Sequence, residues 1–169
     1  MDILIRPEEA KDVEAISQVT YDAFLGKFSD HPTEHLIVNG LRDAGMLTLS
    51  LVAEVDGKVV GHVAFSPVTI NEKYIDWYGL GPISVIPELQ KQGIGSKLIR
   101  DGLAKLRELG AKGCVLEGSP AYYQRFGFKP YAGLTYHASP APEFFMALPF
   151  YEDVPQGAVE YHKSFYVQA

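Results

Sequence analysis

The middle of the chain changes its apolar pattern twice, and this change constrains the fold more than any other feature. An apolar stretch over about 74–86 predicts a strand, and after two glycines an amphipathic pattern predicts a helix over about 96–109 that ends at Gly110. The apolar run within 112–117 is short enough for an interior strand. Two strands joined by a helix in this way form a crossover unit and lie parallel. The buried side of the helix is formed by Leu98, Ile99, Leu103 and Leu106.

The strands before this unit follow one another closely, which favours antiparallel pairing. Apolar residues alternate with mostly polar ones from Leu47 to Val55, and Asp56-Gly57 supplies the residues that a tight hairpin prefers. The return strand covers about 58–68, and together with the next strand it predicts a meander. We therefore expect a mixed α/β (α+β) fold around a mostly antiparallel sheet.

Further elements are expected on both sides of this region. They are a short strand around Ile3 and Ile5, a helix that begins at Pro7, a helix over Thr33 to Arg42, a short helix over Ser119 to Arg125, a strand that opens at Phe128, and strands near 144–148 and 159–165. The chain contains no repeat, low-complexity stretch or charged linker. Residues 1–169 are therefore expected to form a single domain.

Length and cysteine content narrow the class of protein. A chain of 169 residues can bury a core without a disulfide or a structural metal. Cys114 is the only cysteine and lies in an apolar run, so we expect a core residue in a reducing, cytoplasmic protein. Arg6 comes too early for the apolar core of a signal peptide, and no stretch approaches the ~20 apolar residues that span a bilayer. We expect no membrane partner.

The charge balance argues against a nucleic-acid partner. The formal net charge is −6, and no dense run of Lys and Arg appears. An anionic ligand must then be held by a local device, such as the free N–H groups and dipole of a helix N-terminus.

The glycine turn that precedes the central helix is such a device. Gly93 and Gly95 lack side chains, so their backbone can approach a phosphate closely while successive N–H groups point at the anion. A glycine pair before a helix is also explained by a tight turn alone. A Walker phosphate loop is disfavoured because Ser96-Lys97 follows Gly95, and a dinucleotide site is disfavoured because the third glycine is missing.

A second motif separates these alternatives. Residues 119–128 read Ser-Pro-Ala-Tyr-Tyr-Gln-Arg-Phe-Gly-Phe. With the glycine turn, this segment resembles the GNAT superfamily of N-acetyltransferases, which carries a Gln/Arg-x-x-Gly-x-Gly/Ala turn and, roughly thirty residues later, a Tyr followed at four positions by Gly-Phe. The chain opens with Ile5-Arg6-Pro7, as many members do. Residues 51–67 and the ending 157–162 resemble the YhbS-like branch. The resemblance covers nearly the whole chain.

The resemblance implies a GNAT-like twisted sheet of about seven strands, splayed between strands 4 and 5 and flanked by about four helices. It implies acetyl-CoA as cosubstrate and no metal. The strand before the turn would bind the pantetheine arm through the backbone of Ile83, Ser84 and Val85, although ordinary sheet pairing also explains these residues. The turn that would take the pyrophosphate consists of Gln90, Lys91, Gln92, Gly93, Ile94, Gly95 and Ser96.

The resemblance also makes Tyr123 the candidate general acid beside the cofactor. Acyl transfer releases a thiolate, and a phenol with an ordinary pKa of about 10 is protonated at neutral pH and can donate to a sulfur of pKa ~8.5. The alternative is aromatic packing beside the core, which we expect for Tyr122.

A general base is harder to place. Many superfamily members have a carboxylate on the fourth strand where this chain has Gly79, with Asp76 three residues earlier. Glu117, at the end of the fifth strand, is the remaining candidate. A specificity residue or a solvated strand end would explain Glu117 equally well, and a water chain would need no base.

We therefore expect an acetyl-CoA-dependent N-acetyltransferase that acts by direct transfer on a primary amine, on a small molecule or a protein. The alternative is a non-catalytic acyl-CoA-binding sensor, which would keep the cofactor turn and use the acceptor cleft for a partner. His31 and His35 give only two ligands, so a metal site is not expected. The acceptor, the acyl-chain preference and the oligomeric state, a homodimer included, stay open.

Overall fold

The computed structural model describes residues 1–27 and 29–166. Its α-helices are α1 (Val13–Phe24), α2 (Glu34–Asp43), α3 (Ile94–Glu108) and α4 (Pro120–Tyr123). Its strands are β1 (Leu4–Pro7), β2 (Leu49–Val55), β3 (Lys58–Ile70), β4 (Lys73–Val85), β5 (Gly113–Glu117), β6 (Leu134–Thr135), β7 (Phe145–Pro149) and β8 (Gly157–Glu160). Short 3-10 helices are η1 (Ala10–Asp12), η2 (Pro87–Leu89), η3 (Gln124–Phe126), η4 (Pro142–Phe144) and η5 (Lys163–Tyr166).

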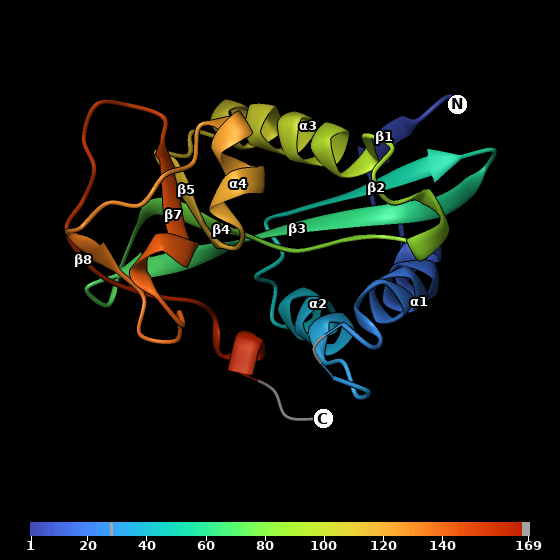
Figure 1. Cartoon of the computed structure of the whole chain (residues 1–169), viewed down its shortest axis with the longest axis horizontal. Helices are drawn as coiled ribbons and strands as arrows, with labels where there is room; N and C mark the ends of the chain where they lie inside the picture. The colour runs from blue at the N-terminus through green and yellow to red at the C-terminus, as the bar shows by residue number, and fades with distance from the viewer. Residues whose placement is uncertain (28, 167–169) are drawn as a thin grey trace.

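The strands form one eight-stranded sheet with the main order β1-β2-β3-β4-β5-β7 (Figure 1). Neighbours along this row are antiparallel except β4 and β5, which the α3 crossover joins in parallel. Short β8 pairs with the far end of β3 and with β6. The expected mixed fold, its meander and its parallel crossover are confirmed. The hairpin turn at Asp56-Gly57 is confirmed as well, with both residues at positive φ.

The sheet splays between β4 and β5. Their pairing covers only three residue pairs and ends at Gly79 and Val115, although β4 continues to Val85. An extra residue in β4 shifts its register against β3 between Leu80 and Ile83. Gly81, within that shift, has a φ of 142°, which favours glycine. The last residues of β4 therefore keep β3 on one side and lack β5 on the other.

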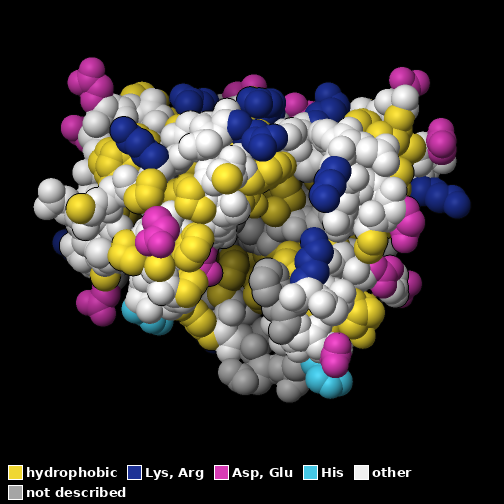
Figure 2. Space-filling view, viewed as in Figure 1, with side chains coloured by type: hydrophobic (Ala, Val, Ile, Leu, Met, Phe, Trp, Pro, Cys, Tyr) yellow, Lys and Arg dark blue, Asp and Glu magenta, His cyan; other side chains and the backbone are white. Residues whose placement is uncertain are grey.

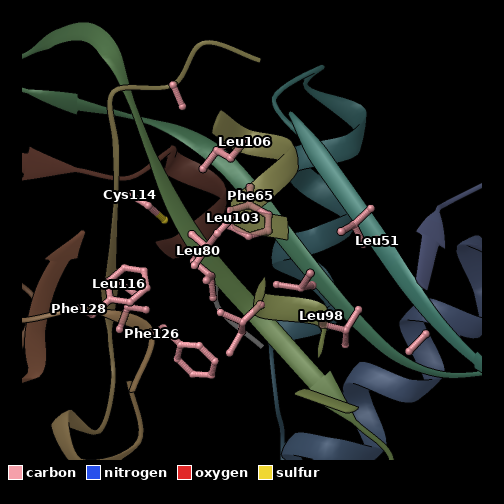
Figure 3. Packing of buried hydrophobic residues seen from close by; sticks show 14 of the residues in the cluster. Leu51, Phe65, Leu80, Leu98, Leu103, Leu106, Cys114, Leu116, Phe126 and Phe128 are labelled. Atoms are coloured by element: carbon pink, nitrogen blue, oxygen red, sulfur yellow. The ribbon is translucent and has the colours of Figure 1, made fainter. Parts of the chain in front are cut away.

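Helices cover the two faces of the sheet, with α3 on one face and α1 and α2 on the other (Figure 1). The main core lies under α3, where Leu98, Leu103 and Leu106 meet Phe65 and Leu80 of the sheet (Figure 3). Gly102 lets α3 approach closely, because a Cβ there would lie 2.4 Å from Phe65 Cε1. This packing fixes where α3 begins relative to the end of β4.

A buried polar network anchors α2 to the other face. The Arg42 guanidinium donates to both carboxylate oxygens of Glu8 at 2.8 and 2.9 Å. Ser50 joins that carboxylate to His62, whose Nε2 lies 2.7 Å from Ser50 Oγ. Complete burial lowers the pKa of His62 to about 4, so the ring stays neutral at physiological pH. The network ties α2, the chain before η1 and the strands β2 and β3 into one wall.

Two expected strands are wrong in part. No strand opens at Phe128: Lys129 exchanges two backbone hydrogen bonds with Ala147, at 3.1 and 2.9 Å, and Pro130, which has no N–H, ends the pairing. The last strand stops at Glu160 and is followed by η5. There the Ser164 N–H donates to His162 Nδ1 at 3.1 Å, so a local side-chain bond replaces the ladder.

Candidate active site

The open edge of β4 carries free backbone groups. The Ile86 N–H donates to the Val60 carbonyl at 2.9 Å, and in that antiparallel register Ser84 also faces β3. Ile83 and Val85 therefore point their N–H and C=O groups away from β3, toward the space that β5 has left. The Val85 carbonyl already accepts from Gln90 Nε2 at 2.9 Å.

The glycine turn follows this edge and leads into α3. Gly93 has a φ of 88° and Lys91 a φ of 64°, so the chain bends sharply before the helix begins at Ile94. The Lys97 N–H donates to the Gly93 carbonyl at 3.1 Å, which leaves the N–H groups of Ile94, Gly95 and Ser96 without an acceptor inside the helix. A 15-residue helix adds the positive end of its dipole at the same place.

Tyr122 lies against the start of α3. A Cβ at Gly95 would lie 3.3 Å from Tyr122 Oη, so the glycine makes room for this hydroxyl. Arg125 donates to the Tyr122 carbonyl at 2.8 Å, and its guanidinium stacks over the Tyr122 ring at 4.6 Å. Two aromatic or cationic side chains after β5 therefore border the turn, although the sequence indicated only packing for Tyr122.

Tyr123 is the last residue of α4, and its ring lies beside Gly118, the residue that follows β5. Gly118 lets its ring approach, because a Cβ at that position would lie 2.5 Å from Tyr123 Cε2. The ring packs edge-on against Tyr122 and Phe128. Burial, with a smaller contribution from Tyr122, raises the pKa of Tyr123 to about 12. The hydroxyl is therefore a proton-bearing donor throughout the physiological range.

These parts enclose one cavity of about 570 Å³, which we call the glycine-turn cavity. Its charged side chains are all basic and come from Lys27, Lys91 and Arg125. Figure 2 shows a hollow near the centre of this face, with Lys and Arg side chains on its upper and right margins. The remaining lining residues are Ile83, Ser84, Val85, Leu89, Gln90, Gly93, Gly95, Ser96, Tyr122 and Tyr123.

A second pocket of about 230 Å³ continues along β4, where residues 80–82 line it. We call it the Tyr161 pocket. Its other lining residues are Phe24, Glu34, Ile37, Glu117, Tyr136, Tyr161 and Phe165. The charged side chains here are both acidic, so the two cavities on neighbouring stretches of β4 have opposite charge.

Tyr161 occupies the space where the resemblance led us to look for a carboxylate. A Cβ at Gly79 would lie 2.4 Å from Tyr161 Cε2, so no larger side chain fits there without rearrangement. Burial raises the pKa of Tyr161 well above its ordinary value. Position 79 of β4 therefore has no side chain that could act as a base, and the neutral Tyr161 ring fills the space beside it.

Most of the sequence-predicted site residues come together around the glycine-turn cavity, but three do not. Gln92 is exposed and outside its lining, and the Ile94 side chain is buried in the core below α3. Glu117 is exposed at the end of β5 and lines the Tyr161 pocket instead. The Tyr123 ring packs against Gly118, the residue that follows Glu117, so the two candidates are near neighbours although they line different cavities.

Sequence reasoning missed several lining residues. Arg125 and Tyr122 lie inside the recognised Tyr motif, so their position in that motif could have indicated them. Lys27 and Glu34 come from the region around the start of α2, which carries no motif that we could interpret.

Other candidates have structural roles. Cys114 is fully buried, and burial raises the pKa of its thiol far above the ordinary value, so it cannot act as a nucleophile.

Residues 1–27 and 29–166 contain no cluster of three or more His, Cys, Asp or Glu that could hold a metal ion. Within the same ranges, no helix has the length and apolar character needed to cross a membrane.

The known sequences that this chain resembles are acetyltransferases. The model of the acetyltransferase (GNAT) family matches residues 13–128. The uncharacterized N-acetyltransferase YhbS of Escherichia coli K12 is 40% identical over 128 residues, which cover 75% of this chain and 74% of YhbS. YjhQ, another uncharacterized N-acetyltransferase of that strain, is 40% identical over 96 residues, which cover 56% of this chain and 53% of YjhQ.

Solved structures extend the similarity to nearly the whole chain. A GNAT family acetyltransferase from Brucella melitensis, crystallised with acetyl-CoA, is 50% identical with a TM-score of 0.87 and covers 97% of this chain and 98% of its own. YhbS from Escherichia coli, crystallised with CoA, is 34% identical with a TM-score of 0.86 and covers 99% of this chain and 93% of its own.

Proposed function

Since the chain belongs to the acetyltransferase (GNAT) family, we propose that it transfers the acetyl group of acetyl-CoA to a primary amine by direct attack on the thioester. Two similar proteins bind acetyl-CoA or CoA in their crystals. The observation that carries the proposal is a single cavity lined by the open edge of β4, the N-terminus of α3 and Tyr123.

The glycine-turn cavity suits each part of this donor. The outward N–H groups of Ile83 and Val85 and the outward carbonyl of Ile83 would pair with the amides of the pantetheine arm, as an added strand would. The free N–H groups at the start of α3 would hold the pyrophosphate, and Lys91 and Arg125 add positive charge beside it. Lys27 extends this positive lining from the opposite helix layer.

Tyr123 would serve the leaving sulfur. Its pKa of about 12 lies well above the ~8.5 of a thiol, so complete proton transfer to the thiolate is uphill. Donation of a hydrogen bond to the sulfur as negative charge develops is therefore the larger part of its role, and the thiolate takes its final proton as the products separate.

Glu117 would take the proton of the incoming amine. An amine must be neutral to attack, and most aliphatic amines are charged at neutral pH. Glu117 is solvent-exposed and lies next to Gly118, against which the Tyr123 ring packs, so a proton accepted there can pass to bulk water.

We propose that residues 1–169 work as one N-acetyltransferase domain. Support comes from the Tyr161 pocket, which combines Phe24 near the N-terminus with Phe165 near the C-terminus. Removal of either end would therefore open the pocket.

Thiol release from acetyl-CoA in the presence of a panel of primary amines tests the proposed function. We expect amine-dependent release, together with acetyl-CoA binding measured by calorimetry. Binding without release for every amine, with longer acyl-CoAs included, would instead support the acyl-CoA-binding sensor.

A further inference from the structure

The Tyr161 pocket differs from its neighbour in chemistry, which bears on the second substrate. Two carboxylates line it, Glu34 from the first turn of α2 and Glu117 from the end of β5. Among the described residues that line the pocket, none is basic. Carboxylates are ionised at neutral pH, so these two side chains give the pocket lining a negative charge. The left margin of the central hollow in Figure 2 accordingly carries apolar and acidic side chains.

Aromatic faces complete the pocket. The rings of Tyr136 and Tyr161 have centroids 4.9 Å apart, and those of Tyr161 and Phe165 lie 4.8 Å apart, so the three form a continuous aromatic wall. Aromatic faces attract cations through their quadrupole, most strongly where water is excluded. Anions and neutral polar groups gain no such attraction.

The Tyr161 hydroxyl is a further polar group of the pocket. Tyr161 is only 9% exposed and lines the pocket. Its hydroxyl makes no hydrogen bond to any residue that the structure describes, and it is not among the fully buried polar atoms, so water can reach it through the pocket. An amine donor that entered the pocket would take the place of that water.

The position of the pocket fits an acceptor site. Leu80, Gly81 and Pro82 line it, and the next three residues of β4 line the glycine-turn cavity. Glu117 lies beside Gly118 and hence beside Tyr123. A molecule in the Tyr161 pocket would therefore meet the thioester at the boundary of the two cavities.

Resting on the proposed acetyl transfer, we infer that the acceptor is a small aliphatic amine with a second positive charge, a diamine in the simplest case. One ammonium proton passes to Glu117 and on to water, the nitrogen–carbon bond forms as the carbon–sulfur bond breaks, and a second nitrogen proton balances the thiol. Once the attacking amine is neutral, two carboxylates still face the pocket. A distal ammonium group held by Glu34 and the aromatic wall offsets this charge.

Three amines of equal length test the charge requirement. They are 1,4-diaminobutane, 4-aminobutan-1-ol and 4-aminobutanoic acid, which share the reacting amine and differ at the far end. Calorimetric titration into protein saturated with CoA measures binding without turnover. We expect the diamine to bind about tenfold more tightly than the amino alcohol, and the amino acid to bind least. Equal affinity of the diamine and the amino alcohol would overturn the inference.

Carboxylate variants locate the selectivity. Glu34→Gln and Glu117→Gln should each weaken diamine binding severalfold, and together they should abolish its advantage over the amino alcohol. Glu108→Gln removes the same charge at the exposed end of α3, outside both cavities, and should leave the affinities unchanged. A diamine preference that survives in the Glu34→Gln/Glu117→Gln double variant contradicts the inference.

Thiol release with the same amines separates this inference from the proposed function. Selective diamine binding without thiol release would refute acetyl transfer and support the cation site. Release with equal kcat/KM for all three amines would support acetyl transfer and refute the cation site.

Discussion

The two cavities that share β4 are built in different ways. The glycine-turn cavity is lined largely by two short segments, 83–96 and 122–125, and much of what it offers a ligand is backbone. The Tyr161 pocket is lined by side chains from both ends and the middle of the chain. A backbone site needs particular residues at fixed spacing and so leaves a motif, whereas a side-chain pocket can change its residues one at a time.

The largest effect that we expect concerns the boundary between the cavities. Tyr123→Phe removes only the hydroxyl and should lower kcat about 100-fold, because proton or hydrogen-bond donation to the leaving group is lost. The Kd for acetyl-CoA should stay within about twofold. Steady-state thiol release and calorimetry measure the two quantities. Tyr74 is 61% exposed, so Tyr74→Phe is the matched control and should leave kcat unchanged. An unchanged kcat in Tyr123→Phe would show that Tyr123 has no part in the mechanism.

The next effect concerns the wall of the Tyr161 pocket. Gly79→Ala places a Cβ 2.4 Å from Tyr161 Cε2 and should lower the free energy of unfolding by about 2 kcal/mol through overpacking. Urea unfolding measures this loss. Tyr161→Leu should recover part of it in the double variant, so a mutant cycle would be non-additive. If the losses of unfolding free energy in the two single variants simply add in the double variant, the Tyr161 ring is not what limits the side chain at position 79.

A smaller effect should be confined to the glycine-turn cavity. Gly95→Ala brings a methyl group to 3.3 Å from Tyr122 Oη and between the helix start and a phosphate. We expect the Kd for acetyl-CoA to rise about tenfold, which is about 1.4 kcal/mol. Alanine favours the helix, so stability to urea should not fall. An unchanged Kd would mean that the donor phosphates lie elsewhere.

The smallest effect concerns pH. Tyr123 donates while protonated, and because burial raises its pKa to about 12 this form persists until the pH approaches that value. An ordinary tyrosine would begin to lose its proton near pH ~10. At saturating acetyl-CoA, kcat should therefore not fall between about pH 8 and 10. A decline with a midpoint near pH 9 would contradict this role for the Tyr123 proton.

Local pattern predicted most of the fold because each element carries its own signal. The α3 helix and its crossover followed from apolar spacing, and Asp56-Gly57 marked the hairpin. The C-terminal tail was predicted less well. The apolar run after Val159 is typical of a strand, but the Ser164 N–H donates to His162 Nδ1 and the chain forms η5 instead. Such competition depends on side-chain geometry, which spacing does not contain.

In the candidate site, too, the residues with a local sequence motif could be predicted, and those placed by long-range packing could not. Gly93, Gly95 and Tyr123 could be found because a close phosphate approach and a donor beside the thioester require those residue types. Glu34 could not be found, since its role depends on how α2 packs near β4. The anchoring of α2 through Arg42 and Glu8 is likewise a long-range contact without a local signal.

Backbone amide exchange of β4, resolved by residue with NMR, tests most directly whether the open strand edge receives the donor. The Ser84 N–H faces β3 and serves as an internal control, whereas the N–H groups of Ile83 and Val85 face the splay. Saturation with acetyl-CoA should slow the exchange of Ile83 and Val85 and leave Ser84 nearly unchanged. Equal protection of all three amides, or of none, would contradict donor binding along this edge.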